Sequence, residues 1–111
     1  MNSEERALKK RVYSQRYVYL LRCSDGSLYC GISADPEARL KQHNYGVGAK
    51  YTRSRRPCQL VYTEGPYEYG RALSREAAVK KMTKAEKLFL KKKKSNEFNK
   101  DPYELGKKFQ I

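Results

Sequence analysis

Several residue types are scarce in this sequence, and each scarcity excludes a class of protein. There is no tryptophan and a single histidine, and the three cysteines, Cys23, Cys30 and Cys58, form no Cys-x-x-Cys pair. Structural zinc sites need clustered cysteine and histidine ligands, so this pattern excludes one. An odd, scattered set of cysteines is typical of reduced thiols, which predicts a cytoplasmic protein.

Long apolar runs are also missing. No stretch approaches the roughly 20 apolar residues that cross a bilayer. Residues 1–16 carry charges of both signs and lack the apolar segment of a signal peptide. We therefore expect no membrane partner.

Acidic residues are few, and the basic excess is the strongest feature of the composition. The chain has 25 Lys and Arg against 12 Asp and Glu, a net charge of +13 in 111 residues. That length fits one domain, and 10 tyrosines argue against a disordered chain. The charge predicts a polyanionic partner such as a nucleic acid.

The first half of the chain predicts a hairpin followed by a helix. Residues 17–22 and 27–33 are rich in strand-forming side chains and flank the turn signal Ser24-Asp25-Gly26. Asp35 before Pro36 has the pattern of a helix start, and this helix should run to about residue 44. A basic loop over residues 50–57 follows.

The second half supplies one more strand and two more helices. The strand covers residues 59–63 and should end before Gly65-Pro66. One helix spans about 68–81, and the capping box that starts at Thr83 opens the next helix, which ends in the lysine run 91–94. The order β-β-α-β-α-α predicts an α+β fold with a small three-stranded, mainly antiparallel sheet flanked by helices. The predicted boundaries are a charged N-terminal extension (1–15), the domain (16–94) and a polar C-terminal tail (95–111).

The length of the hairpin loop decides whether Tyr19 and Tyr29 share a face of the sheet. Neighbouring residues of a strand alternate between faces, so a two-residue loop would separate the two tyrosines. A three-residue loop over Ser24-Asp25-Gly26 pairs Tyr29 with Leu21 and Tyr19 with Gly31, which puts both tyrosines on one face. Because the last residue of such a loop favours glycine, we predict the three-residue loop.

These residues resemble the GIY-YIG nuclease family. Tyr17-Val18-Tyr19 stands where the family has Gly-Ile-Tyr, and Tyr29-Cys30-Gly31 stands where it has Tyr-Ile-Gly. Arg39, His43 and Glu76 follow in the order and spacing of the family. The chain looks like a member of a small single-domain bacterial branch, which is similar to the nuclease domain of the Slx structure-selective endonuclease.

The resemblance implies an enzyme that hydrolyses phosphodiester bonds with one Mg²⁺ or Mn²⁺ ion held by Glu76. Arg39 would neutralise the charge that grows on the phosphate. Tyr19, Tyr29 and His43 would position or deprotonate the attacking water. The sequence leaves open which of these three side chains is the base.

The basic loop is the predicted contact with DNA. Its cations would bind phosphates, and its tyrosine would stack on an unpaired base. We expect single-stranded or branched DNA as the substrate, because so short a chain has little surface for a long recognition site. The predicted nucleic-acid-binding residues are Lys50, Tyr51, Arg53, Arg55 and Arg56.

Two other interpretations stay open from the sequence. One is a non-catalytic, basic nucleic-acid-binding module with the same fold, in which Glu76 is structural. The other is a basic protein associated with RNA or the ribosome. We expect a monomer, with room for an unidentified protein partner.

Overall fold

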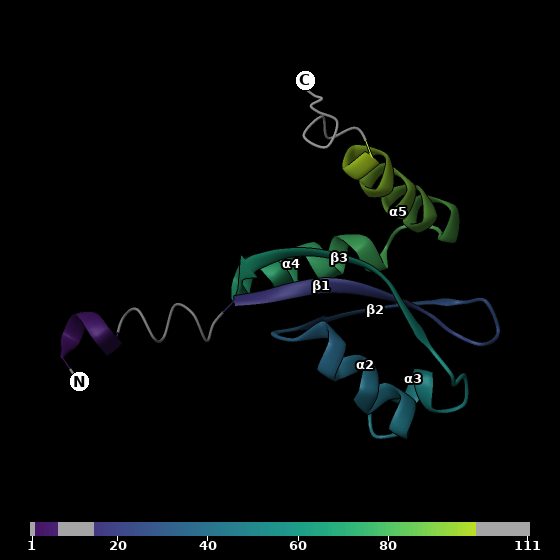
Figure 1. Ribbon diagram of the computed structural model, residues 1–111, viewed down its shortest axis with the longest axis horizontal. Coiled ribbons are helices and arrows are strands. Elements are labelled where there is room, and N and C mark those ends of the chain that lie inside the picture. Colours follow the sequence, from purple (N-terminus) through teal and green to yellow (C-terminus); the bar gives the residue numbers. More distant parts are fainter. Residues whose placement is uncertain (1, 7–14, 100–111) are drawn as a thin grey trace.

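Three antiparallel strands in the order β2-β1-β3 form the centre of the fold in the computed structural model, which describes residues 2–6 and 15–99 (Figure 1). This sheet, flanked by helices, confirms the predicted α+β class. The elements are β1 (Gln15–Arg22), β2 (Leu28–Ser33), α2 (Pro36–Tyr45), α3 (Lys50–Arg53), β3 (Gln59–Glu68), α4 (Tyr69–Lys80) and α5 (Lys84–Asn99).

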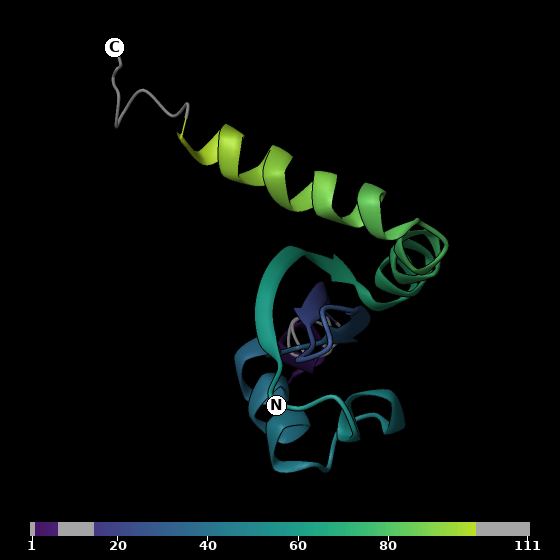
Figure 2. The same cartoon turned by 90° about the vertical axis from the view of Figure 1, so that its right-hand side faces the viewer.

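The helices cover the two faces of the sheet separately. Helices α2 and α3 lie on one side of the strands, and α4 lies on the other, followed by α5 (Figures 1 and 2). Residues of β1 alternate between these sides: Val18 and Leu20 pack with Val79 of α4, whereas Tyr19 and Leu21 pack on the side of α2. None of the described helices combines the length and the apolar character that a bilayer crossing requires.

The hairpin has the predicted three-residue loop. Tyr19 pairs with Gly31 and Leu21 pairs with Tyr29 across β1 and β2. The Gly26 amide donates to the Cys23 carbonyl at 2.9 Å, and Gly26 has a left-handed φ of 84°. The two tyrosines of the motif therefore share the face that α2 covers.

Both predicted helix-start signals are confirmed. The Asp35 side chain accepts a hydrogen bond from the Ala38 amide at 3.1 Å at the start of α2. At the start of α5, the Thr83 hydroxyl accepts from the Glu86 amide at 3.1 Å, and the Glu86 carboxylate accepts from the Thr83 amide at 2.8 Å. These caps fix the points at which the chain turns into helix.

The predicted end of the third strand is wrong, because β3 continues through Gly65-Pro66 to Glu68. In the sheet order, β3 is an edge strand bonded to β1 alone. An edge strand tolerates proline, since one side of it makes no ladder hydrogen bonds. The pairing also shifts register between Arg16 and Val18, where Gly65 adopts a φ of 112°. A bulge therefore absorbs the two residues that were expected to end the strand.

Two further boundaries differ from prediction. The basic segment begins with the single helical turn α3 instead of being loop throughout, and α5 extends beyond residue 94 to Asn99. The predicted N-terminal extension and C-terminal tail lie partly outside the described residues, in 1, 7–14 and 100–111. The division of the chain into these three parts stays a prediction.

Truncation of Leu20 should destabilise the protein strongly. This side chain is 1% exposed between the central strand and α4, so Leu20→Ala should lower the free energy of unfolding by about 2–5 kcal/mol. Urea denaturation measures the change. Leu88→Ala is the matched control, because Leu88 is 43% exposed and its loss should change the value by about 0.5 kcal/mol at most. Equal effects of the two variants would contradict this assignment of the core.

Candidate active site

Two strands and a helix bring three predicted site residues together on the α2 side of the sheet. Tyr19 comes from β1, Tyr29 from β2 and His43 from α2. The ring centroids of Tyr29 and His43 are 5.2 Å apart, and those of Tyr19 and His43 are 6.1 Å apart. The two tyrosine rings are separated by 6.5 Å. We call these three side chains the tyrosine–histidine cluster.

A buried chain of hydrogen bonds runs through this cluster. The Tyr19 hydroxyl lies 2.9 Å from His43 Nε2, and His43 Nδ1 lies 2.7 Å from Thr52 Oγ1. The Thr52 hydroxyl in turn donates to the Ala49 carbonyl at 2.9 Å. Tyr19, His43 and Thr52 are at most 1% exposed. Buried polar groups with this many partners hold one geometry, because a lost partner costs about 1–3 kcal/mol.

Two glycines let the rings approach the backbone closely. A Cβ atom at Gly31 would lie 2.5 Å from the Tyr19 hydroxyl oxygen, and one at Gly48 would overlap His43 Nδ1. The predicted open space at Gly31 is therefore present, and the Tyr19 ring fills it. Any larger residue at either position would displace a member of the cluster.

Electrostatics keep both members of the Tyr19–His43 pair neutral near pH 7. Burial raises the pKa of Tyr19 to about 12, Tyr29 adds to this increase, and the nearby Arg39 guanidinium opposes it. Burial, followed by the charge of Arg39, lowers the pKa of His43 below its usual value. The pair consequently holds a protonated phenol and an unprotonated imidazole, which is the state needed to pass a proton from Tyr19 to His43.

Arg39 lies one helical turn before His43 on α2. Its guanidinium donates to the Gln42 side chain at 2.7 Å and acts on the Tyr19 hydroxyl. A half-exposed arginine beside the cluster offers a fixed positive charge to an incoming phosphate.

The predicted DNA-binding residues lie next to the cluster, on α3 and the segment after it. The Tyr51 ring stacks on Tyr29 with centroids 5.9 Å apart and planes at 25°, and the Arg55 guanidinium lies 3.9 Å from the Tyr51 ring centroid. Arg55 also pairs with Asp25 at 3.0 Å. The aromatic surface thus extends from the buried site to the exposed basic segment, which consists of Lys50, Tyr51, Arg53, Arg55 and Arg56.

Two arginines of this basic segment are partly engaged within the protein. Besides its pair with Asp25, Arg55 donates to the Tyr51 carbonyl at 2.9 Å. Arg56 donates to the Arg53 carbonyl at 2.9 Å. The exposed Lys50 and Arg53 side chains are the cations of this segment best placed to meet phosphate.

Glu76 does not join the cluster through any contact among the described residues. It lies on α4, which packs on the opposite face of the sheet, and its carboxylate pairs with Lys80 at 3.4 Å. It also acts on the buried Cys30 thiol: burial, followed by the charge of Glu76, raises the pKa of Cys30 to about 11. Because Cys30 follows Tyr29 directly in β2, Glu76 lies near the same edge strand from the other face.

The environment of Glu76 is compatible with a single hard cation. Its side chain is 17% exposed, so the carboxylate is accessible but partly desolvated. No group of three or more His, Cys, Asp or Glu side chains suited to a metal ion occurs in the part of the chain that the structure describes. A cation held by one carboxylate would therefore keep water or phosphate oxygens as its other ligands, which is how Mg²⁺ is commonly bound.

The sequence interpretation missed a second buried polar group, centred on Glu64. This carboxylate is 10% exposed and accepts hydrogen bonds from Tyr62 at 2.6 Å and from Tyr67 at 2.7 Å. Arg75 of α4 donates to both of its oxygens, at 2.5 and 3.1 Å. The network ties β3 to the helix that carries Glu76, and Arg75 precedes Glu76 directly.

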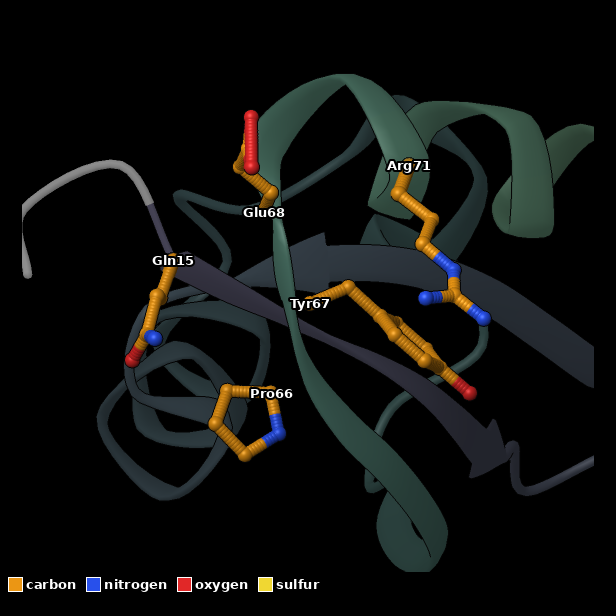
Figure 3. A pocket seen from close by; sticks show the side chains of 5 residues that line it. All are labelled: Gln15, Pro66, Tyr67, Glu68 and Arg71. Atoms are coloured by element: carbon orange, nitrogen blue, oxygen red, sulfur yellow. The ribbon is translucent and has the colours of Figure 1, made fainter. Parts of the chain in front are cut away.

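A shallow cavity of about 350 Å³ lies at the junction of β3 and α4 (Figure 3). The Arg71 guanidinium lies beside the Tyr67 ring there, 5.5 Å from its centroid. None of the predicted site residues lines this cavity, so it is separate from the tyrosine–histidine cluster. Its lining residues are Gln15, Pro66, Tyr67, Glu68 and Arg71.

Comparison with known families matches most of this chain. The model described as "GIY-YIG catalytic domain" matches residues 15–99. This range covers every strand and every helix from α2 to α5.

Curated relatives include UPF0213 proteins of two bacteria. The protein of Syntrophus aciditrophicus is 53% identical over 78 residues, which cover 69% of this chain and 90% of that protein. The protein of Staphylococcus aureus strain Mu3 is 50% identical over 74 residues, which cover 67% of this chain and 90% of that protein.

Two solution NMR structures are also similar. A UPF0213 protein of Bacillus halodurans is 43% identical, with a TM-score of 0.43, and the match covers 68% of this chain and 81% of that one. A protein of E. faecalis is 43% identical, with a TM-score of 0.48 and coverage of 70% and 84%.

Proposed function

Since the chain belongs to the GIY-YIG catalytic domain family, a nuclease family, we propose that it is a metal-dependent DNA endonuclease that acts on single-stranded or branched DNA. The observation that carries this proposal is the buried pair of a protonated Tyr19 and an unprotonated His43, 2.9 Å apart and beside Arg39. A hydrolase needs a group that removes a proton from water, and this pair has that capacity.

The pair would share the work of deprotonation. With a pKa of about 12, Tyr19 is not itself a base near neutral pH. It accepts a proton from water as its own proton moves to His43 Nε2, which leaves hydroxide to attack phosphorus. Arg39 stabilises the negative charge that develops on the phosphate oxygens. Tyr29 borders both rings and would position the water.

Glu76 would hold the metal ion. Nucleases of this family are generally metal-dependent, and the partly exposed carboxylate with no further acidic ligand suits Mg²⁺ or Mn²⁺. When bound, such an ion lowers the pKa of a coordinated water and neutralises phosphate charge.

The preference for unpaired DNA rests on the stack of Tyr51 on Tyr29. An unpaired base that extends this stack would direct its own backbone toward the cluster, whereas bases inside a duplex do not offer a free face. The basic segment beside the stack would contact phosphates without reading sequence.

Removal of two cations from this segment should weaken DNA binding at every sequence. Lys50→Ala combined with Arg53→Ala should lower the salt dependence of the binding constant for a single-stranded oligonucleotide by roughly 1.4, or about 0.7 for each phosphate contact. Fluorescence anisotropy over a range of salt concentrations measures this slope. The charge-matched control is Lys91→Ala with Lys92→Ala on α5, and an equal loss in the control would contradict the assigned contact surface.

A second candidate function is a non-catalytic nucleic-acid-binding module. The observation that favours it is the ion pair of Glu76 with Lys80 on the face opposite the tyrosines. In that case Glu76 is structural, and the basic surface alone accounts for function.

A cleavage assay at low salt separates the two functions. End-labelled single-stranded, duplex, flap and four-way-junction DNA are incubated with the protein in Mg²⁺, in Mn²⁺ and in excess chelator. The nuclease proposal predicts metal-dependent cuts, faster in single-stranded or branched DNA than in plain duplex. Tight binding without cuts in any of the four would support the binding module instead.

We also propose a monomer in the reducing environment of the cytoplasm. All three cysteines are buried and free, and the sulfur atoms of Cys23 and Cys58 lie only 3.7 Å apart. Thiols so close would be expected to couple in an oxidising compartment.

A further inference from the structure

Thr52 is the buried residue of the one-turn helix α3, and its hydroxyl lies 2.7 Å from the imidazole of His43. We infer that Thr52 is a positioning residue that fixes the tautomer of His43, so that Nε2 is free to accept the proton of Tyr19. This inference deepens the proposed nuclease function and rests on it for its kinetic consequence. Its structural part is testable without any substrate.

The argument starts at the Tyr19 hydroxyl, which is almost fully buried. Within the described residues, two side chains act on it as hydrogen-bond partners: His43 through Nε2 at 2.9 Å, and Arg39. A guanidinium only donates. The phenol proton therefore has His43 Nε2 as its acceptor, which requires Nε2 to be unprotonated.

The tautomer follows from this acceptor. A neutral imidazole carries one proton, so Nδ1 bears it when Nε2 is free. The acceptor for Nδ1–H is Thr52 Oγ1 at 2.7 Å, and the proton of the Thr52 hydroxyl goes to the Ala49 carbonyl at 2.9 Å. Every proton in this chain of bonds then points in one direction, from Tyr19 toward Ala49.

The opposite tautomer breaks the chain at its functional end. If Nε2 carried the proton, Nδ1 would accept from the Thr52 hydroxyl, with the Ala49 amide at a long 3.4 Å. Nε2–H would then donate to the Tyr19 oxygen, and the buried phenol proton would have no acceptor among the described residues. Such an orphaned group costs about 1–3 kcal/mol, which favours the first tautomer by a large factor.

The local fold explains why a threonine in a basic segment reaches His43. The close approach at Gly48 lets the chain fold back against the imidazole, and α3 then starts at Lys50. Thr52 consequently turns inward, whereas its neighbours Tyr51 and Arg53 are exposed. One short helix thus carries both the proposed DNA contacts and the group that orients the proposed base.

The first test is the tautomer of His43 in the whole protein, read from ¹⁵N chemical shifts of the imidazole. Because the chain contains one histidine, the ring signals need no assignment. We expect, near neutral pH, a protonated Nδ1 and an unprotonated Nε2. A protonated Nε2 in the unmodified protein would overturn the inference, whether or not the protein cuts DNA.

The second test compares Thr52→Val, which removes the hydroxyl and keeps the shape, with Thr52→Ser, which keeps the hydroxyl. Thr52→Val should shift the ring toward the other tautomer and lower kcat by roughly 10- to 100-fold with KM for DNA unchanged. Thr52→Ser should keep the original tautomer and most of kcat.

The outcomes distinguish this inference from the proposed function. Should Thr52→Val keep both the original tautomer and the rate, Thr52 has no positioning role. Should it fail to fold, the spectra of the unmodified protein and of Thr52→Ser still decide the tautomer. If no DNA is cut by any variant, the nuclease proposal fails, while the tautomer remains decided by the spectra.

Discussion

Replacement of Glu76 by glutamine should lower DNA cleavage by about 10³-fold or more and leave DNA binding intact. Glutamine keeps the size of the side chain but loses the charge that would hold a divalent cation, and a metal ion contributes several kcal/mol to such a reaction. Because the ion pair of Glu76 with Lys80 is a surface pair on one helix, its loss should cost little stability. Single-turnover cleavage and anisotropy binding measure the two properties separately.

The matched control is Glu68→Gln. Glu68 is an exposed carboxylate at the N-cap of the same helix, and its side chain makes no capping bond. It should cut DNA at the unmodified rate. If Glu76→Gln also cuts at that rate, the metal role is wrong; if it loses binding and cleavage together, Glu76 serves the fold or the DNA contact instead.

Tyr19→Phe should lower the cleavage rate by about 10²- to 10³-fold and preserve the fold. The phenyl ring still fills the space over Gly31, but the hydroxyl that links water to His43 is gone. Tyr45→Phe is the control, because Tyr45 is 80% exposed and makes no contact with the cluster among the described residues. Equal rates for Tyr19→Phe and the unmodified protein would remove Tyr19 from the proton path.

The pH dependence of cleavage should identify His43 as the final proton acceptor. Burial and Arg39 lower the pKa of His43, so the rate should be constant above about pH 6.5 and fall as the pH drops through this lowered value. Stability should change in the same direction. The unfolded chain binds a proton on histidine more readily than the folded one, so the stabilising effect is complete above the unfolded pKa and is lost on acidification.

His43→Gln provides the control for this pH dependence. Both the acid limb of the rate profile and the His43 share of the stability change should disappear in the variant. Persistence of the acid limb in His43→Gln would assign it to another group.

Local patterns in the sequence were enough to predict the centre of the site. Strand alternation and the glycine at the end of the loop fix the register of the hairpin, so Tyr19 and Tyr29 were expected on one face and lie there. The cap at Asp35 likewise fixes where α2 begins, and with it the place of Arg39 and His43.

What could not be predicted depends on contacts between distant parts of the chain. Thr52 acts through a histidine nine residues away, and nothing in the sequence around it marks it as buried. Glu64 meets Arg75 across two elements. The passage of β3 through Gly65-Pro66 depends on its edge position, which is a property of the whole sheet.

The position of Glu76 illustrates the same limit. Helical spacing predicts that it borders the apolar face of its helix, and its side chain is only 17% exposed. Which face of the sheet the helix covers follows from the topology. The structure places α4 against Val18, Leu20 and Cys30, opposite the tyrosines.

The central claim is that a metal ion held by Glu76 acts on the same phosphate as the tyrosine–histidine cluster. Paramagnetic line broadening by Mn²⁺ tests it directly, in labelled protein bound to a short single-stranded oligonucleotide with a non-hydrolysable backbone. We expect added Mn²⁺ to broaden signals around Glu76 and the ring signals of Tyr29 and His43 together, and Glu76→Gln to abolish both effects. Broadening confined to α4, or broadening at His43 that persists in Glu76→Gln, would contradict the claim.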